Sequence, residues 1–359
     1  MPTNFCWHCL SELSENVFGY FCLTTMALSP NELPDKIDVI QSFRGFATLS
    51  VLITHLWSIQ DSIIINARLK KATNLGWYGV QIFCIISGFI LVYSLYKHDY
   101  KLKNYFKFIV RRLVRLEPAY LVSILLALFF EFKVYPFFEM TFSSIHHSTR
   151  DILLHFFYLV SIVRDAHWVQ DVYWTLAVEF QFYIVIGLIA PTLFSPQVKK
   201  YFKHIILIIL LVLSTLFGQL DVFSFFVIGM STFFWVNKTF TNIEMVIQIV
   251  LASITNYMVF KNPYSLIFFF TVPIIVNALL YKKIKLFAFF GKISYSLYLV
   301  HGVIGIFIIQ FFEKKLPISS IQMQILALSL AIIASVVCAY IFYHLFENPF
   351  TKLARKINI

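Results

Sequence analysis

Two basic side chains stand inside the first long apolar stretch of the chain, residues 38–57. Arg44 and His55 are eleven residues apart. At 100° per residue this spacing leaves them about 20° apart around a helix and about 16 Å apart along it. An ionisable side chain inside an apolar helix is costly to insert and points to a functional site. Taken singly, Arg44 and His55 fit the two membrane interfaces; the alignment of the pair favours chemistry.

Three arginines, Arg111, Arg112 and Arg115, form a second group at the start of the apolar stretch 110–130. Arg111 and Arg115 are four residues apart and share one helical face. Guanidinium groups present planar donor forks that fit phosphate oxygens. The alternative is a simple anchor at the cytoplasmic interface. Because Lys would anchor equally well, the arginines favour binding of a polyanionic donor such as coenzyme A.

A carboxylate, Glu179, stands in a third apolar stretch, residues 172–192, with Trp174 near its start. Thr175 and Tyr183 lie one turn before and after Glu179, on the same helical face. The carboxyl group either is neutral and bonded across helices, or orients an acceptor hydroxyl or a histidine. Its isolation from neutralising partners favours the functional interpretation.

A polar stripe of Ser294, Tyr298 and His301 follows one face of the stretch 292–312. Hydrogen bonds between helices explain Ser and Tyr in membranes, whereas His301 favours the lining of a pore or pocket. The residues expected to bind the acceptor or line its pocket are Trp174, Tyr183, Ser294, Tyr298 and His301. Ser87 and Gly88 are small residues that predict close helix packing. The sequence holds no Walker loop, HExxH or GxSxG pattern, and its five cysteines predict neither a metal site nor a disulfide framework.

The composition indicates lipid as the solvent. Of the 359 residues, 59% are hydrophobic and 13% are charged, far from the balance of a soluble domain. We therefore predict an all-α, polytopic membrane bundle with about ten helices, in contact with membrane lipid. The net charge of +11 follows from basic residues between apolar runs, so it reflects topology and not nucleic-acid binding. The predicted spans are 38–57, 76–96, 110–130, 172–192, 204–219, 221–237, 243–260, 264–281, 292–312 and 320–346.

The distribution of Lys and Arg predicts the orientation. With the N-terminus inside, 19 of the 29 basic residues fall in cytoplasmic segments and nine in outer ones, so both termini are expected in the cytoplasm. We expect residues 1–36 to be a polar leader, of which 1–25 are dispensable and Met26 is an alternative start. Residues 37–350 form the transmembrane domain, and 351–359 form a basic cytoplasmic tail. The long outer connection 131–171 is expected to be either functional or disordered, with 152–162 on the membrane surface or re-entering it.

These motifs, in this order, resemble acyltransferase family 3 over most of residues 37–350. The matching residues are Arg44, Gly45, Ala47 and His55; Gly79, Val80, Phe83, Ser87, Gly88 and Phe89; Arg111, Arg112, Arg115, Pro118, Ala119 and Tyr120; Trp174, Thr175, Leu176, Glu179, Phe182 and Tyr183; and Ser294 to Leu299 with His301. Two positions depart from the family pattern, since Gln41 stands where an Asp is frequent and Cys84 where an aromatic residue is. The chain also lacks the SGNH domain of larger members.

The resemblance implies an O-acyltransferase, most often an O-acetyltransferase, in the cell membrane, such as a bacterial inner membrane. Acyl-CoA would be the co-substrate on the cytoplasmic side, with no bound cofactor, and the acceptor would be a carbohydrate or lipid-linked glycan. His55 would take the acceptor proton, and Arg44 would hold the donor or the developing negative charge. Direct transfer and an acyl-His55 intermediate both remain open.

Two other function classes compete with this interpretation. A transporter or flippase for a glycan or lipid intermediate would line its path with the polar stripes. Residues 38–192 and 204–346 show no mutual similarity, whereas transporters often carry related halves. A purely structural membrane protein would have no use for Arg44, His55 and Glu179 inside apolar stretches.

Overall fold

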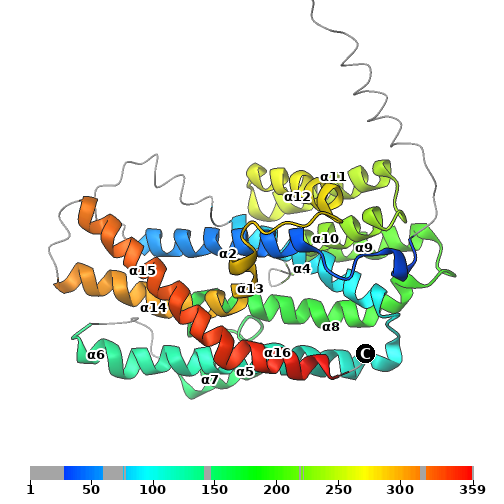
Figure 1. The fold of residues 1–359 in the computed structure, drawn as a ribbon. Coiled ribbons are helices and arrows are strands. Elements are labelled where there is room, and N and C mark those ends of the chain that lie inside the picture. Colours follow the sequence, from blue (N-terminus) through cyan, green and yellow to red (C-terminus); the bar gives the residue numbers. More distant parts are fainter. Residues whose placement is uncertain are drawn as a thin grey trace, which may run out of the picture.

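A computed structural model gives the fold, and it describes residues 28–59, 76, 78–140, 147–217, 220, 222–315 and 321–357. Within those ranges the regular elements are all helical, with no strand. Most of the long helices run along the long axis of the molecule, and α15 crosses it obliquely (Figure 1). The predicted all-α architecture is therefore confirmed.

Each predicted span coincides with one helix. The long helices are α2 (Asp38–Ile59), α4 (Tyr78–Lys97), α5 (Tyr105–Phe129), α8 (Trp174–Phe194), α9 (Lys200–Leu216), α10 (Phe223–Val236), α11 (Asn242–Phe260), α12 (Leu266–Leu279), α14 (Ser294–Lys315) and α15 (Ile321–Phe342). Seven helical stretches of the described chain are long and apolar enough to cross a membrane, whereas α10 and Pro263–Leu279 are apolar but shorter. The count of ten spans and the sides of the termini stay predictions.

Short elements extend or join these helices. A π-helical turn, Phe130–Val134, carries α5 into α6 (Tyr135–Phe137), and a second one, Tyr343–Glu347, carries α15 into α16 (Asn348–Arg355). The others are η1 (Pro30–Glu32), η3 (Leu102–Asn104), α7 (Thr149–Phe156), η5 (Asp171–Tyr173), η7 (Pro263–Ser265) and α13 (Ala288–Lys292). The helix that starts in the last span thus continues to Arg355, into the predicted tail.

Helix α4 lies at the centre of the bundle, and α11 lies at its rim. In α4, 72% of the apolar 18-residue stretch is buried inside the bundle, against 28% of the corresponding stretch in α11. Large apolar side chains such as Ile254, Ile267 and Ile333 stay exposed on α11, α12 and α15. An apolar surface of this extent is what a helix presents to lipid rather than to water.

Glycines bring the central helices into backbone contact. A Cβ atom on Gly88 would lie 2.3 Å from the Phe226 carbonyl oxygen, and one on Gly229 would lie 2.0 Å from that of Ile85. Helices α4 and α10 therefore cross as closely as small residues allow. Gly291 of α13 approaches α2 in the same way, since its Cβ would lie 2.0 Å from the Gln41 oxygen. This contact sets the start of α14 beside α2.

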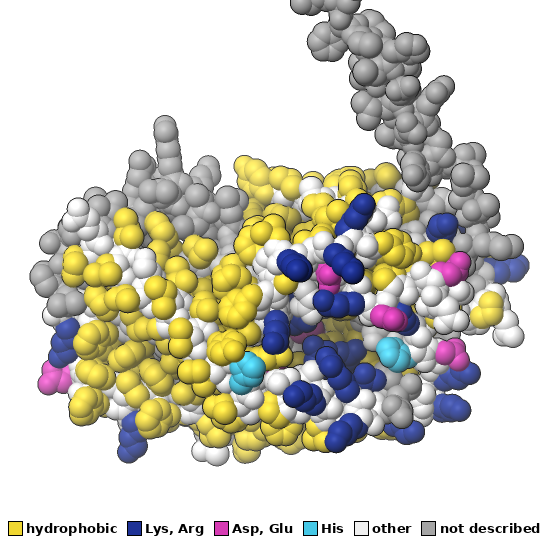
Figure 2. All heavy atoms as spheres, viewed as in Figure 1, with side chains coloured by type: hydrophobic (Ala, Val, Ile, Leu, Met, Phe, Trp, Pro, Cys, Tyr) yellow, Lys and Arg dark blue, Asp and Glu magenta, His cyan; other side chains and the backbone are white. Residues whose placement is uncertain are grey.

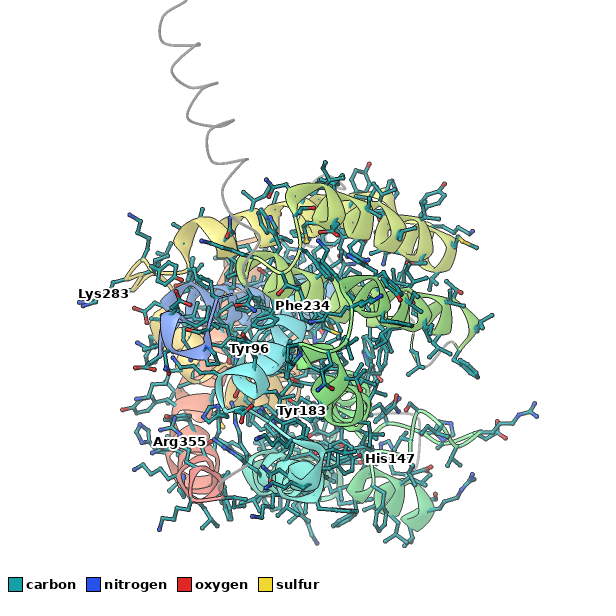
Figure 3. The ribbon with its side chains drawn as sticks, turned by 90° about the vertical axis from the view of Figure 1, so that its right-hand side faces the viewer. Tyr96, His147, Tyr183, Phe234, Lys283 and Arg355 are labelled. Atoms are coloured by element: carbon teal, nitrogen blue, oxygen red, sulfur yellow. The ribbon has the colours of Figure 1, made fainter. Side chains whose placement is uncertain are left out.

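The bundle has a basic end, where α2 begins and α4 ends, marked by Lys36, Lys97, Lys283 and Arg355. Figure 2 shows Lys and Arg side chains gathered on this half, over α13 and α16, and hydrophobic side chains over the other half. Figure 3 looks onto the basic end, with Lys283 and Arg355 at the margin and Tyr183 among the helices. The opposite end is where α2 and α14 terminate.

The residues just before α2 are fixed to the basic end of α4. Tyr96 Oη donates to the Leu28 carbonyl oxygen at 2.8 Å, Lys97 Nζ donates to that of Leu33 at 2.8 Å, and Lys97 pairs with Asp35 at 2.6 Å. Residues 28–36 are therefore part of the packed structure. The predicted dispensability of residues 1–25 and the alternative start at Met26 fall outside the described residues.

Candidate active site

A cavity of about 190 Å³ lies between α2, α4, α5, α8, α10 and α14. Its lining on α4 extends from Val80 to Ser94, which corresponds to about 21 Å along the helix axis. Apolar side chains form much of the wall: Val80, Phe83, Cys84, Ile86, Ile90, Leu91, Leu116, Leu176 and Phe226. The polar lining is Arg44, Ser87, Ser94, Arg112, Arg115, Thr175, Glu179, Tyr183, Ser294, Tyr295 and Tyr298. Most of the predicted site residues therefore share one cavity.

Three guanidinium groups from two helices face this cavity. Arg44 comes from α2, and Arg112 and Arg115 come from α5. The guanidinium carbon of Arg112 sits between two aromatic rings, 5.4 Å from the Phe108 centroid and 5.3 Å from that of Tyr183. Stacking on aromatic faces stabilises a cation and fixes its direction. Within the described part of the chain, the lining of this cavity therefore has three guanidinium groups and one carboxylate, that of Glu179.

Arg111 does not join this group, contrary to the prediction that pairs it with Arg115. Its Nη1 donates to the carbonyl oxygen of Ile357 at 3.4 Å, next to the end of α16. The sequence cannot distinguish Arg111 from Arg112, because helix spacing shows which residues share a face but not which face meets the bundle centre. The cationic wall is therefore built by Arg44, Arg112 and Arg115.

Glu179 is held by two hydroxyl groups. Its Oε1 accepts from Tyr183 Oη at 2.6 Å and from Ser87 Oγ at 3.0 Å. Ser87 therefore does more than allow the predicted close packing, a role that belongs to Gly88. Hydrogen bonds to a carboxylate are stronger than neutral ones. The bond from Ser87 joins α4 to α8, the bond from Tyr183 lies within α8, and together they hold the carboxylate in one orientation.

A second carboxylate, Glu347, supports the site from outside its lining, and no sequence pattern singled it out. Its Oε2 accepts from Ser296 N at 3.1 Å and from Ser296 Oγ at 2.6 Å, and its side chain is buried. Its charge interacts with those of Arg44 and Arg115. The available signal was a carboxylate directly after the last apolar run of the chain. Glu347 ties the C-terminal helices to the start of α14.

Tyr298 lines the cavity, and its ring lies beside that of His301, with the two centroids 5.8 Å apart. Its hydroxyl donates to the Val172 carbonyl oxygen at 2.9 Å and lies 2.7 Å from Thr175 Oγ1, while the Phe83 ring lies 6.3 Å away. The other members of the predicted polar stripe take different positions. Ser294 lines the cavity, and its hydroxyl donates to the Gly291 carbonyl oxygen at 2.9 Å. Trp174 is half-buried and lies outside the lining.

His55 and His301 meet beyond Tyr298. Their rings are nearly parallel, at 24°, and His55 Nδ1 lies 3.0 Å from His301 Nε2. His301 is 1% exposed, whereas His55 is half-buried. His301 therefore does not line the cavity as the sequence predicts for an acceptor pocket. It contacts the predicted base instead, about 16 Å along α2 from Arg44.

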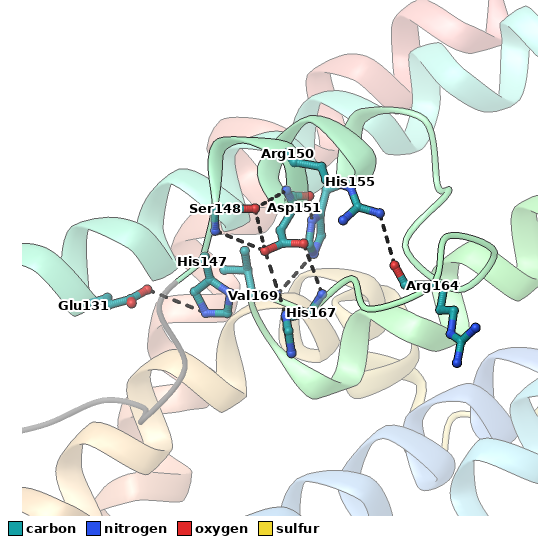
Figure 4. A network of polar contacts seen from close by, with 9 residues as sticks. All are labelled: Glu131, His147, Ser148, Arg150, Asp151, His155, Arg164, His167 and Val169. Atoms are coloured by element: carbon teal, nitrogen blue, oxygen red, sulfur yellow. Dashed lines mark hydrogen bonds and ion pairs between the residues drawn. The ribbon is translucent and has the colours of Figure 1, made fainter.

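The segment 147–173 packs against α5 and α8, and its end reaches the histidine pair. Asp151 accepts from Ser148 Oγ at 2.8 Å and from the backbone N–H of His167 at 3.2 Å (Figure 4). Burial opposes ionisation of Asp151, but the hydrogen bonds from Ser148 and His167 outweigh it and lower the pKa of the carboxyl group. A Cβ on Gly302 would lie 2.6 Å from Gln170 Oε1, so the segment also contacts α14 beside His301.

His155 is the centre of this segment. Its Nδ1 donates to the Asp151 carbonyl oxygen at 2.7 Å, and its Nε2 accepts from the Val169 N–H at 3.2 Å. The contact at Nε2 requires the neutral ring, because the charged ring has no lone pair there. Burial accordingly lowers the pKa of the His155 imidazole. The segment therefore has a defined fold that depends on an uncharged histidine.

Comparison with known proteins identifies the family of the chain. ORF330 of Acidianus two-tailed virus, which carries the provisional name of an acetyltransferase, is 31% identical over 150 residues, which are 42% of this chain and 40% of that protein. The chain thus matches less than half the length of this relative. No solved structure matches the chain significantly. The model of a family described as "Acyltransferase domain" matches residues 37–344, most of the chain. The chain is therefore a multi-pass membrane protein that belongs to acyltransferase family 3.

Proposed function

We propose that the chain transfers an acyl group from acyl-CoA to a hydroxyl group of a carbohydrate or lipid-linked glycan. The observation that carries the proposal is the separation of two groups of residues in one bundle. We call them the cationic pole, which is Arg44, Arg112 and Arg115, and the histidine pole, which is His55 and His301. Arg44, Arg112 and Arg115 line one cavity, and His55 of the histidine pair lies about 16 Å from Arg44 along α2.

The donor fits the cationic pole. Coenzyme A carries phosphates at one end and its thioester at the end of a long flexible arm. Arg44, Arg112 and Arg115 would bind the phosphates from the basic end, because guanidinium forks match phosphate oxygens. The apolar wall between Val80 and Ser94 would take the arm and exclude water from the thioester. The basic end would then face the cytoplasm, as the charge distribution predicts.

The histidine pole supplies the base. The acceptor oxygen would attack the thioester carbonyl carbon and form the C–O bond, while the hydroxyl proton passes to His55. The C–S bond then breaks, and the thiolate leaves as the thiol with the proton from His55. In the alternative route His55 attacks first and carries the acyl group to the acceptor. Glu179, held by Ser87 and Tyr183, would keep the cavity side of the site in one geometry.

The acceptor is assigned by the family alone, since no contact in the described residues selects one hydroxyl compound over another. A cell-membrane location suits a glycan acceptor, which would approach from the opposite end, where His55 is half-buried. Family membership supports an enzyme over a flippase, and a hydrogen-bonded histidine pair is a feature that a conduit would not need.

The test is transfer of label from radioactive acetyl-CoA to a surface glycan in membranes that contain the chain. We expect transfer in the parent chain, none above background in His55→Ala, and nearly normal transfer in Arg111→Ala, whose guanidinium faces Ile357. Label that stays on the protein and is lost in His55→Ala would identify the acyl-His55 route. Flux of a lipid-linked sugar without label transfer would contradict the proposal and favour a flippase.

A further inference from the structure

The hydrogen bonds of His301 define which of its ring nitrogens carries the proton. Nδ1 lies 2.8 Å from the Tyr298 carbonyl oxygen and 3.0 Å from that of Leu297. Carbonyl oxygens only accept hydrogen bonds, so Nδ1 must be the donor. In the neutral ring the lone pair is then on Nε2, the nitrogen that faces His55.

The direction of the bond between the two rings follows. His301 Nε2 accepts, so His55 Nδ1, at 3.0 Å, must donate. A neutral His55 with its proton on Nδ1 holds its basic lone pair on Nε2. Two helix carbonyl groups of α14 thus determine, through His301, which nitrogen of His55 is the base.

The packing around His301 keeps it from turning over. The ring is 1% exposed, and the Tyr298 ring lies 5.8 Å from it. Near it, α14 meets α2 closely, since a Cβ on Gly305 would lie 2.4 Å from Leu56 Cδ2. A flipped ring would place Cδ2 at the carbonyl groups and Cε1 at His55, so the hydrogen bonds on both sides of the ring would be lost, which is unfavourable in a buried site.

We propose that His301 is a positioning residue that fixes the tautomer of His55, and not part of the acceptor pocket. The inference rests on the proposed function, in which His55 is the base. The hydroxyl proton is taken by Nε2 of His55, and the Nδ1–H bond to His301 persists in the imidazolium. No proton passes to His301. The arrangement resembles a catalytic triad in which a neutral ring replaces the orienting carboxylate.

Two variants at position 301 separate hydrogen bonding from packing. His301→Gln places a carbonyl oxygen near the position of Nε2, so it can still accept from His55. His301→Leu fills the space without an acceptor. We expect His301→Leu to lower kcat about 10–100-fold, the range for loss of a group that orients a histidine, with little change in KM for acyl-CoA. His301→Gln should recover most of that loss.

The tautomer itself is read from ¹⁵N resonances of histidine side chains in the full chain in lipid, with His55 assigned by comparison with His55→Asn. We expect a protonated Nδ1 and an unprotonated Nε2 for His55, and the opposite tautomer or a mixture in His301→Leu. A parent chain with the proton on Nε2 of His55 would overturn the inference, as would equal kcat in the two position-301 variants. The spectrum of the parent chain decides the matter even if His301→Leu fails to accumulate.

The same experiments distinguish failure of the proposed function from failure of the positioning role of His301. If His55→Ala keeps full acyl transfer, His55 is not the base, although the spectrum can still report its bond to His301. If His55→Ala is inactive and the tautomer is wrong, only the positioning role of His301 is lost.

Discussion

The cavity and the histidine pair are built on opposite principles. The cavity gathers charged groups, with Arg44, Arg112, Arg115 and Glu179 in an apolar wall. The histidine pair consists of two rings joined by a hydrogen bond of 3.0 Å. Helix carbonyl groups at His301 Nδ1 set the direction of that hydrogen bond. Charge in a low-dielectric site binds a charged ligand strongly, whereas a neutral base near a reacting hydroxyl can take its proton.

In the proposed reaction, this difference would separate donor binding from proton transfer along the axis of α2. A polyanionic donor gains most from the guanidinium groups near the basic end. Proton transfer gains most from a histidine remote from those cations, because nearby positive charge would disfavour its protonation in the transition state. Changes at the two places should therefore affect different kinetic constants.

The largest effect is expected at the histidine pair. His55→Ala should lower the rate about 10²–10⁴-fold, the usual worth of a general base, while the chain still inserts and accumulates. The rate of the parent chain should also fall as pH decreases, because only the neutral imidazole accepts a proton. The measurement is acyl transfer at saturating acyl-CoA, normalised to the amount of chain in the membrane. Full activity in His55→Ala would remove the histidine pole from the account.

The next effect is expected at the cationic pole. Arg112→Ala with Arg115→Ala should raise KM for acyl-CoA more than it lowers kcat, because it removes binding energy shared by the ground and transition states. Each lost contact to a phosphate is worth about 1.5–3 kcal/mol, so a rise of tenfold or more is expected. The matched control is Arg111→Ala, and equal effects of all three arginines would show that the cluster only sets topology.

A smaller effect is expected at the link between α4 and α8. Ser87→Ala removes one of the two hydrogen bonds to Glu179 and leaves Tyr183 in place. The cost should be about 1–2 kcal/mol of stability or donor affinity, which is roughly a 5- to 30-fold change. Thermal unfolding in detergent with and without acyl-CoA measures it. Ser42→Ala on α2 is a suitable control, because among the described residues its hydroxyl donates to the Asp38 carbonyl oxygen of its own helix, at 3.3 Å, and to no other helix.

The smallest effect is expected in the segment 147–173, through His155. Because burial lowers the pKa of His155 in the folded segment, an opened segment binds a proton more readily. The stability of the segment is thus complete above the ordinary histidine value of about 6.5 and decreases as pH falls below it. Limited proteolysis across that range should show cleavage in the segment only on the acidic side.

His155→Gln provides the comparison for this prediction, because its side chain does not titrate. The variant should be cleaved to the same extent on both sides of pH 6.5 or so. Acid-dependent cleavage that persists unchanged in His155→Gln would assign the effect to another group, with Asp151 and His167 the nearest candidates.

Much of the fold could be predicted because lipid imposes a simple pattern. Apolar runs of near 20 residues had to be helices, and each predicted span holds one. The sequence could not show that α10 has only 14 residues, nor that residues 28–36 are bonded to α4. Hydropathy measures transfer to lipid, whereas such details depend on contacts between segments far apart in the chain.

The site was predictable as a set of residues but not as an arrangement. Costly groups in apolar helices identified Arg44, His55 and Glu179, because each must have a partner or a function. The partners of these and neighbouring residues could not be predicted. Arg111 is hydrogen-bonded to Ile357, Ser87 to Glu179, and His301 to His55. Helical spacing relates residues of one helix, and the rotation of one helix against another is set by packing.

The most direct test of the two-pole account is the side from which the donor acts. Sealed vesicles of both orientations are given labelled acetyl-CoA, which does not cross membranes, with glycan acceptor on both sides. Labelling of Lys101→Cys, compared with the parent chain, reports which face carries the basic end. The account predicts transfer only when acetyl-CoA is present at the basic end, and its loss in His55→Ala. Equal transfer from the opposite face would contradict it.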